Sequence, residues 1–196
     1  KIAFSSKASN LIVGDINGNR DDIFVKDLTT GEVTLINTDV DGVQASGGYY
    51  QMRLSADGNK VAFQSYLNNL VLGDTNNVID AFVKDLSTGV ITRVSTDSQG
   101  REANGESYNP VLSADGTKVA FYNGSSNLVS GHLNLNGGVF VKDLITGLTS
   151  LISLTKEGEE GNGLSINPEI SADGNQVVFW SQASNLVAND TNGQDD

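Results

Sequence analysis

Short loops rich in Asp and Asn recur along the chain, and their side chains are the residues best suited to bind a cation. Ca²⁺ takes six to eight oxygen ligands, and alternating Asp and Asn in a tight loop direct several carboxylate and amide oxygens inward. We therefore expect Ca²⁺ binding in these loops. The same residues can instead form Asx turns that brace a hairpin. The candidate ligands are Asp15, Asn17 and Asp22, then Asp74, Asn76 and Asp80, and finally Asp190 and Asn192.

The third copy of this loop is a natural contrast. His132, Asn134 and Gly138 stand at the corresponding positions, so we expect any calcium site to be lost there. His132 is the only histidine, and the sequence suggests no partners for a Ser-His-Asp triad around it. We expect His132 to be a surface loop residue and the chain not to be an enzyme.

Aromatic residues outside the strand cores are candidates for contact with a ligand. Tyr122 and Trp180 occupy one phase of a long repeat, and Tyr50 and Tyr108 occupy another. The segment 103–108 should open on the same face as the Asp/Asn loops, because alternate loops of an antiparallel sheet emerge at the same end. Such a face could stack against and hydrogen-bond a glycan or a peptide. The alternative is that these rings pack between repeat units.

The repeat that positions these loops is visible in the phenylalanines. All seven fall into two columns at steps of 58 or 59, namely Phe4, Phe63, Phe121 and Phe179, then Phe24, Phe82 and Phe140. A residue type confined to fixed phases fills an equivalent core position in successive units. We place the units at approximately 1–46, 47–104, 105–162 and 163–196, within one domain that spans 1–196.

Each repeat unit predicts four short β-strands. Ser-Ala-Asp-Gly at 55–58 and Asp-Leu-Ser-Thr-Gly at 85–89 are typical of hairpin turns, in which Asp makes an Asx turn and Gly takes a positive φ. The segments between the turns are apolar at adjacent positions, as in strands covered on both faces. Tandem four-stranded units of this kind predict an all-β propeller, with a long β-solenoid as the alternative.

One lysine recurs beside the second phenylalanine column, at Lys26, Lys84 and Lys142. We expect these lysines to lie at solvated strand edges or to form pairs between neighbouring blades.

The same strings resemble TolB-like β-propeller repeats, which are bacterial relatives of WD-repeat blades. The matching residues are Ser-Ala-Asp-Gly-x-Lys-Val-Ala-Phe, Ser-Asn-Leu, Gly-Asp-Thr-Asn and Phe-Val-Lys-Asp-Leu-x-Thr-Gly, and they recur along the whole chain. The resemblance implies a propeller of four-stranded antiparallel blades. It does not select a function, because propellers host binding, scaffolding and catalysis alike.

The length bounds the number of blades. At 58 residues per unit, 196 residues correspond to about three and a half blades. We expect an open arc or a fragment of a longer propeller. Its exposed blade face and open blade edges would favour self-association.

Composition excludes some partners. The net charge of −12 and the pI near 4.3 argue against nucleic acid and against an anionic membrane surface. The absence of cysteine excludes disulfides and thiolate metal sites. No apolar run is long enough for membrane insertion.

These observations favour a non-catalytic binding or scaffold module that recognises a protein or glycan at a bacterial surface, with Ca²⁺ in its loops. We expect a secreted, periplasmic or cell-surface location. The alternative function is the substrate-gating propeller of a larger hydrolase, such as a serine peptidase.

Overall fold

The computed structural model describes residues 1–39, 41–45, 51–133, 136–188 and 190. Over these residues every regular element is a β-strand, and all strand pairs are antiparallel. The first sheet holds β1 (Ile2–Ser6), β2 (Asp22–Lys26) and β3 (Val33–Leu35). The second holds β4 (Met52–Leu54), β5 (Lys60–Ser65), β6 (Asp80–Asp85) and β7 (Ile91–Arg93). The third holds β8 (Ser107–Leu112), β9 (Lys118–Asn123), β10 (Gly138–Asp143) and β11 (Thr149–Leu151), and the fourth holds β12 (Ser165–Ile170) and β13 (Val177–Ser181).

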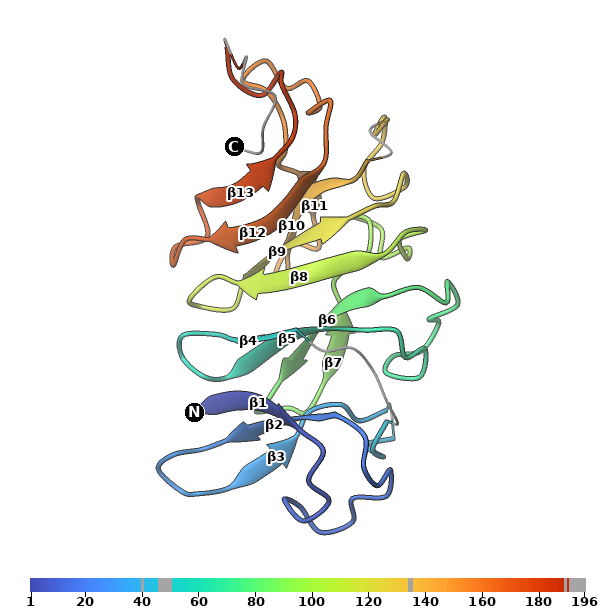
Figure 1. Ribbon diagram of the computed structural model, residues 1–196, viewed down its shortest axis with the longest axis vertical. Helices are drawn as coiled ribbons and strands as arrows, with labels where there is room; N and C mark the ends of the chain where they lie inside the picture. Colours follow the sequence, from blue (N-terminus) through green and yellow to red (C-terminus); the bar gives the residue numbers. More distant parts are fainter. Residues whose placement is uncertain (40, 46–50, 134–135, 189, 191–196) are drawn as a thin grey trace.

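The four sheets follow one another along the long axis of the molecule, and strands within each sheet lie in chain order (Figure 1). We call them the first to fourth blades. Short turns lie at the left end of the blades in this view, and the longer loops lie at the right end. The prediction of an all-β, propeller-type array of antiparallel blades is therefore confirmed.

The short turns have the predicted chemistry. In the second blade, Asp57 Oδ1 accepts hydrogen bonds from Ser55 Oγ at 2.6 Å and from the Asn59 amide at 3.0 Å. Gly58 follows with φ of 69°, a left-handed conformation that costs glycine little because it has no Cβ. The strands on either side of the turn, β4 and β5, are thereby set in register, with Met52 opposite Phe63.

The hydrophobic core lies between the blades. Phe63 and Phe82 are fully buried and pack with Ile23 and Ile36 of the first blade. The equivalent pair in the third blade, Phe121 and Phe140, packs with Ala62, Ala81 and Val83 of the second blade. These two phenylalanine pairs thus fill the space beside the preceding blade, which confirms the predicted burial for the second and third blades. Phe4 and Phe179, in the first and last sheets, are only partly buried.

The lysine column joins neighbouring blades. Lys84 Nζ donates to the carbonyl oxygens of Leu35 and Ile36, at 3.3 and 2.9 Å, and to Thr38 Oγ1 at 3.0 Å. Lys142 reaches back to the second blade in the same way, through Thr96 and Asp97 carbonyls. Both lysines are buried. The first alternative, that these lysines lie at solvated strand edges, was therefore wrong for Lys84 and Lys142. The second alternative, that they contact the neighbouring blade, is confirmed.

Candidate functional site

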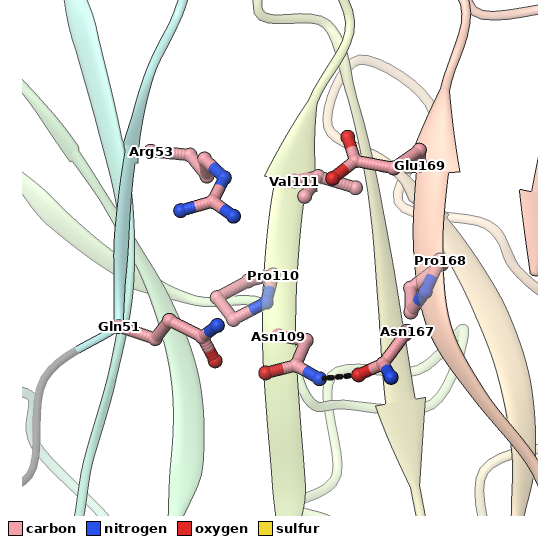
Figure 2. A pocket seen from close by; sticks show the side chains of 8 residues that line it. All are labelled: Gln51, Arg53, Asn109, Pro110, Val111, Asn167, Pro168 and Glu169. Carbon is pink, nitrogen blue, oxygen red and sulfur yellow. Dashed lines mark hydrogen bonds between the residues drawn. The ribbon is translucent and has the colours of Figure 1, made fainter.

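The first strands of successive blades, β4, β8 and β12, contact one another and form the floor of a shallow pocket (Figure 2). In a propeller the first strands lie nearest the axis, so we call this the axial pocket. Its volume is about 190 Å³. Its lining residues are Gln51, Arg53, Asn109, Pro110, Val111, Asn167, Pro168 and Glu169.

A β-bulge places two asparagine side chains in this pocket. The strand register shifts between Tyr108 and Val111 in β8, and the same shift recurs in β12. Asn109 and Asn167 occupy the bulges with φ of 54° and 51°, a left-handed conformation that asparagine tolerates better than most residues. Each is followed by proline, which has no N–H to donate and is therefore tolerated at a bulge.

The pocket presents paired amides and opposite charges. Asn109 Nδ2 donates to Asn167 Oδ1, and Gln51 lies on the same side of the pocket (Figure 2). Arg53 and Glu169 are both exposed and lie on opposite sides of Val111 (Figure 2). A carboxamide offers both a donor and an acceptor, so this surface can hydrogen-bond a peptide backbone or sugar hydroxyls while accommodating charge of either sign.

Sequence reasoning missed the axial pocket, although a signal was present. The chain has only two prolines, and both stand in Asn-Pro pairs 58 residues apart, at Asn109-Pro110 and Asn167-Pro168.

Of the predicted ligand-binding aromatics, Tyr108, Tyr122 and Trp180 do not line the axial pocket. The rings of Tyr108 and Tyr122 stack on each other with centroids 6.0 Å apart, and Tyr108 donates a hydrogen bond to Glu106. Trp180 is 60% exposed on β13. Tyr50 lies outside the described residues. Ligand binding by these four residues stays a prediction.

In the second blade, an arginine stands among the predicted calcium ligands. Arg93 Nη1 lies 3.2 Å from Asp74 Oδ1, 2.9 Å from Glu102 Oε2 and 3.7 Å from Asp80 Oδ2. The Arg93 side chain is 8% exposed. The guanidinium thus supplies positive charge to three carboxylates where the sequence predicts a cation.

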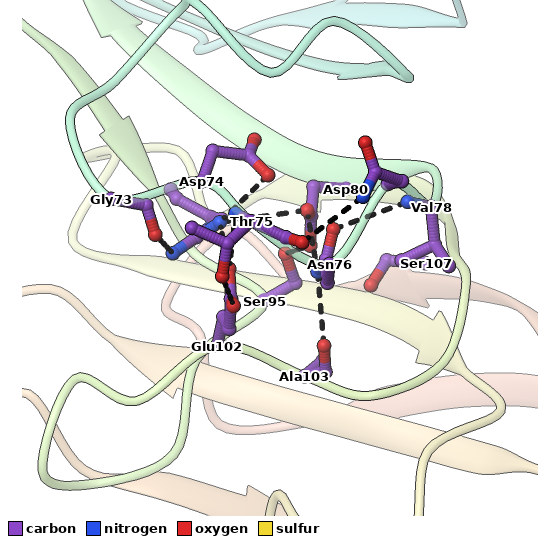
Figure 3. Close-up of polar contacts among 12 residues, drawn as sticks. Gly73, Asp74, Thr75, Asn76, Val78, Asp80, Ser95, Glu102, Ala103 and Ser107 are labelled. Carbon is purple, nitrogen blue, oxygen red and sulfur yellow. Dashed lines mark hydrogen bonds and ion pairs between the residues drawn. The ribbon is translucent and has the colours of Figure 1, made fainter.

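This ionic cluster ties the loop after β5 to the segment after β7 (Figure 3). The Thr75 amide donates to Glu102 Oε2 at 3.0 Å. Asn76 Nδ2 donates both to Asp80 Oδ2 and to the Ala103 carbonyl, each at 2.9 Å. The prediction that these two segments open on the same face is confirmed.

Burial sets the proton affinity of the cluster. It raises the pKa of Asp74 to about 6, and the charges of Asp80 and Glu102 add to the increase while Arg93 opposes it. Burial also raises the pKa of Asp80, against the hydrogen bonds from Ser95 and Asn76.

In the first blade the Asp carboxylates accept hydrogen bonds from side-chain amides and have no arginine beside them at the equivalent position. Leu35 stands at the phase of Arg93, and Gln44 stands at the phase of Glu102. Gln44 Nε2 donates to Asp15 Oδ1 at 3.2 Å and to Asp22 Oδ2 at 2.9 Å. Asn17 Nδ2 donates to Asp22 Oδ1 at 2.8 Å.

In the third blade, His132 takes the place of the first Asp. Its Nδ1 lies 3.0 Å from Glu160 Oε1, and its side chain is 1% exposed. The expectation that His132 is a surface residue was therefore wrong, because its ring packs edge-on against Phe140. In the fourth blade Asp190 is partly buried, and Asn192 lies outside the described residues.

Within the described part of the chain, no three or more His, Cys, Asp or Glu side chains are grouped so that they could hold a metal ion. Calcium binding by the Asp/Asn loops stays a prediction.

Comparison with solved structures identifies the fold. The sequence matches no protein-family profile and no curated protein. A structure described as TolB of Agrobacterium tumefaciens is similar over 91% of this chain and 49% of its own, with a TM-score of 0.55 and 18% identity. The tricorn protease is similar over 84% of this chain and 13% of its own, with a TM-score of 0.53 and 14% identity. A prolyl endopeptidase is similar over 83% of this chain and 23% of its own, with a TM-score of 0.51 and 14% identity.

The fold is that of a TolB-like β-propeller. The chain spans about half the length of the TolB structure that it matches. Propellers of this shape occur both in TolB and in peptidases. The described residues contain no helix long and apolar enough to cross a membrane.

Proposed function

We propose that the chain is part of a non-catalytic propeller that binds a protein segment at the axial pocket. The observation that carries this proposal is the pair of Asn-Pro bulges, which direct Asn109 and Asn167 toward one shallow pocket between Arg53 and Glu169. A left-handed residue other than glycine costs conformational energy, and such strain tends to concentrate at binding sites. The mixed charge and paired amides suit an extended peptide, whose backbone needs both donors and acceptors.

A bacterial secreted, periplasmic or cell-surface location belongs to the same proposal. It rests on the likeness to TolB repeats and on the acidic, cysteine-free composition. Glycan recognition is the competing outcome of the binding test, because sugar hydroxyls use the same amide donors and acceptors.

The test is binding of the chain to peptide and glycan arrays, followed by calorimetric titration of the best ligand. The N109G/N167G double variant keeps the left-handed backbone, because glycine adopts positive φ freely, and removes both carboxamides. We expect this variant to lose affinity by about tenfold or more. A matched control is Asn77→Gly, since Asn77 is also left-handed, with φ of 56°, but lies in the loop after β5. Equal binding by wild type and the double variant would contradict the proposal.

The second candidate function is a substrate-gating propeller in a larger hydrolase. The likeness to the tricorn protease and to a prolyl endopeptidase favours it. Under this proposal the axial pocket contacts substrate on its way to a separate catalytic domain. The test measures peptidase activity of the full gene product and of its R53A and E169A variants. Altered cleavage of peptides, with normal cleavage of small chromogenic substrates, would support this candidate over the first.

A further inference from the structure

A second groove lies at the outer rim, where the hairpin that follows the first blade meets the second blade. Its volume is about 540 Å³, and its lining includes Asp39, Asp41, Leu72, Val90 and Ile91. It shares no lining residue with the axial pocket. We call it the rim groove.

The rim groove exposes large aliphatic side chains that the core does not use. Leu72 is 85% exposed and Val90 is 58% exposed. Leu70, two residues earlier, is 1% exposed and already fills the core between the first and second blades. Exposure of Leu72 is therefore not a by-product of core packing.

A structural twin of the groove shows that the fold does not require its chemistry. The twin lies between the second and third blades, and its lining includes Gln99, Ser130 and Thr149. These residues stand 58 positions after Asp41, Leu72 and Ile91. The repeat thus builds the same groove twice, and at these three positions it carries acidic and aliphatic side chains once and neutral polar ones once.

The acidic charge of the rim groove has no basic partner in the described part of the chain. Asp39 Oδ1 accepts hydrogen bonds from the amides of Asp41 and Val43, at 3.0 and 2.9 Å. The ion pairs among the described residues involve neither Asp39 nor Asp41, and no lysine or arginine lines the groove. In the twin groove, Arg101 Nε lies 2.6 Å from Asp97 Oδ2 and neutralises the equivalent of Asp39.

We propose that the rim groove is a docking site for a protein segment that presents an aliphatic side chain next to a lysine or arginine. The aliphatic side chain packs on Leu72, Val90 and Ile91, and the cation pairs with Asp39 and Asp41. Charge complementarity selects this occupant, since an acidic segment would be repelled by a chain of net charge −12. This site would act independently of the axial pocket.

The test uses a short fluorescein-labelled peptide of leucine and lysine and measures its fluorescence anisotropy with the whole chain. The L72S/D41Q variant gives the rim groove the residues that its twin carries at Ser130 and Gln99, so it preserves a chemistry that the fold accepts. The matched control is L28S/I145S, which removes two exposed aliphatic side chains, one from the β2–β3 turn and one from the β10–β11 turn. Thermal melting of all three proteins checks that each is folded.

We expect L72S/D41Q to bind the peptide about tenfold more weakly than wild type, and L28S/I145S to bind it normally. A leucine–glutamate peptide should not bind, and added salt should weaken the leucine–lysine complex. Equal binding by wild type and L72S/D41Q, equal loss in both variants, or no binding by wild type would each overturn the proposal. Binding to phosphatidylcholine vesicles that L72S/D41Q abolishes, without peptide binding, would assign the groove to lipid and also overturn it.

Discussion

Arg93, the last residue of β7, places its Nη1 3.2 Å from Oδ1 of Asp74, which lies in the loop after β5. The same guanidinium reaches Glu102 of the following segment. The second blade therefore has a positively charged side chain beside its Asp/Asn loop. The first blade has none at the equivalent position, because Leu35 stands there.

Asp74 should make stability depend on pH. Its folded pKa of about 6 lies above the ordinary value of 3.8, so between these values the folded state binds more protons than the unfolded state. The free energy of unfolding should therefore fall as the pH rises from about 4 to 6, by on the order of 1–2 kcal/mol. Urea unfolding across this range measures it. Asp74→Asn should remove that part of the slope, and an unchanged slope would contradict the role of Asp74.

Calcium should act differently on the first two loops. Coulomb repulsion between Ca²⁺ and the Arg93 guanidinium opposes a site that uses Asp74 and Asp80. We expect Arg93→Leu, which copies Leu35, to gain more thermal stability from millimolar calcium than the wild type does. Melting with calcium and with chelator measures the difference. If neither protein responds, the Asp/Asn loops are Asx turns rather than calcium sites.

The buried phenylalanines between blades should carry much of the stability. Phe82 is fully buried against the first blade, so Phe82→Ala should cost about 3–5 kcal/mol in the free energy of unfolding. Phe179 occupies the other column but is only half-buried in the described structure. Phe179→Ala should therefore cost clearly less. Chemical denaturation of both variants tests the ordering, and a similar loss for the two would be inconsistent with a core placed between blades.

Lys84 should contribute a pH dependence of the opposite sign. Burial lowers its pKa to about 8, below the ordinary lysine value of 10.5, so the unfolded state binds more protons between these values. The free energy of unfolding should rise through this window as the pH increases. Lys84→Met should flatten the rise. Lys26→Met is the matched control, because Lys26 has the same repeat phase but is exposed, and it should leave the slope unchanged.

The sequence by itself determined the blade architecture. Its signals are local or periodic. The spacing of the phenylalanines indicates a buried face, Ser-Ala-Asp-Gly indicates a turn, and runs of adjacent apolar residues indicate strands. The strand register that places Met52 opposite Phe63 follows from the Ser-Ala-Asp-Gly turn between β4 and β5. The sequence also predicted that the Asp/Asn loops and the segment 103–108 lie on the same face, because alternate connections of an antiparallel sheet emerge at the same end.

Only the tertiary structure decided which side chains that are distant in the chain meet, within a blade or between two blades. Lys84 contacts Thr38 and Arg93 contacts Asp74, although 46 and 19 residues separate these pairs in the chain. Burial of His132 and Lys84 likewise depends on a neighbouring blade or segment that repeat phase does not reveal. The two Asn-Pro pairs were visible in the sequence, but their meeting in one pocket required the first strands to converge at the axis. Such contacts arise when loops and strands far apart in the chain pack together, whereas a repeat pattern describes only which residue types recur at a given phase.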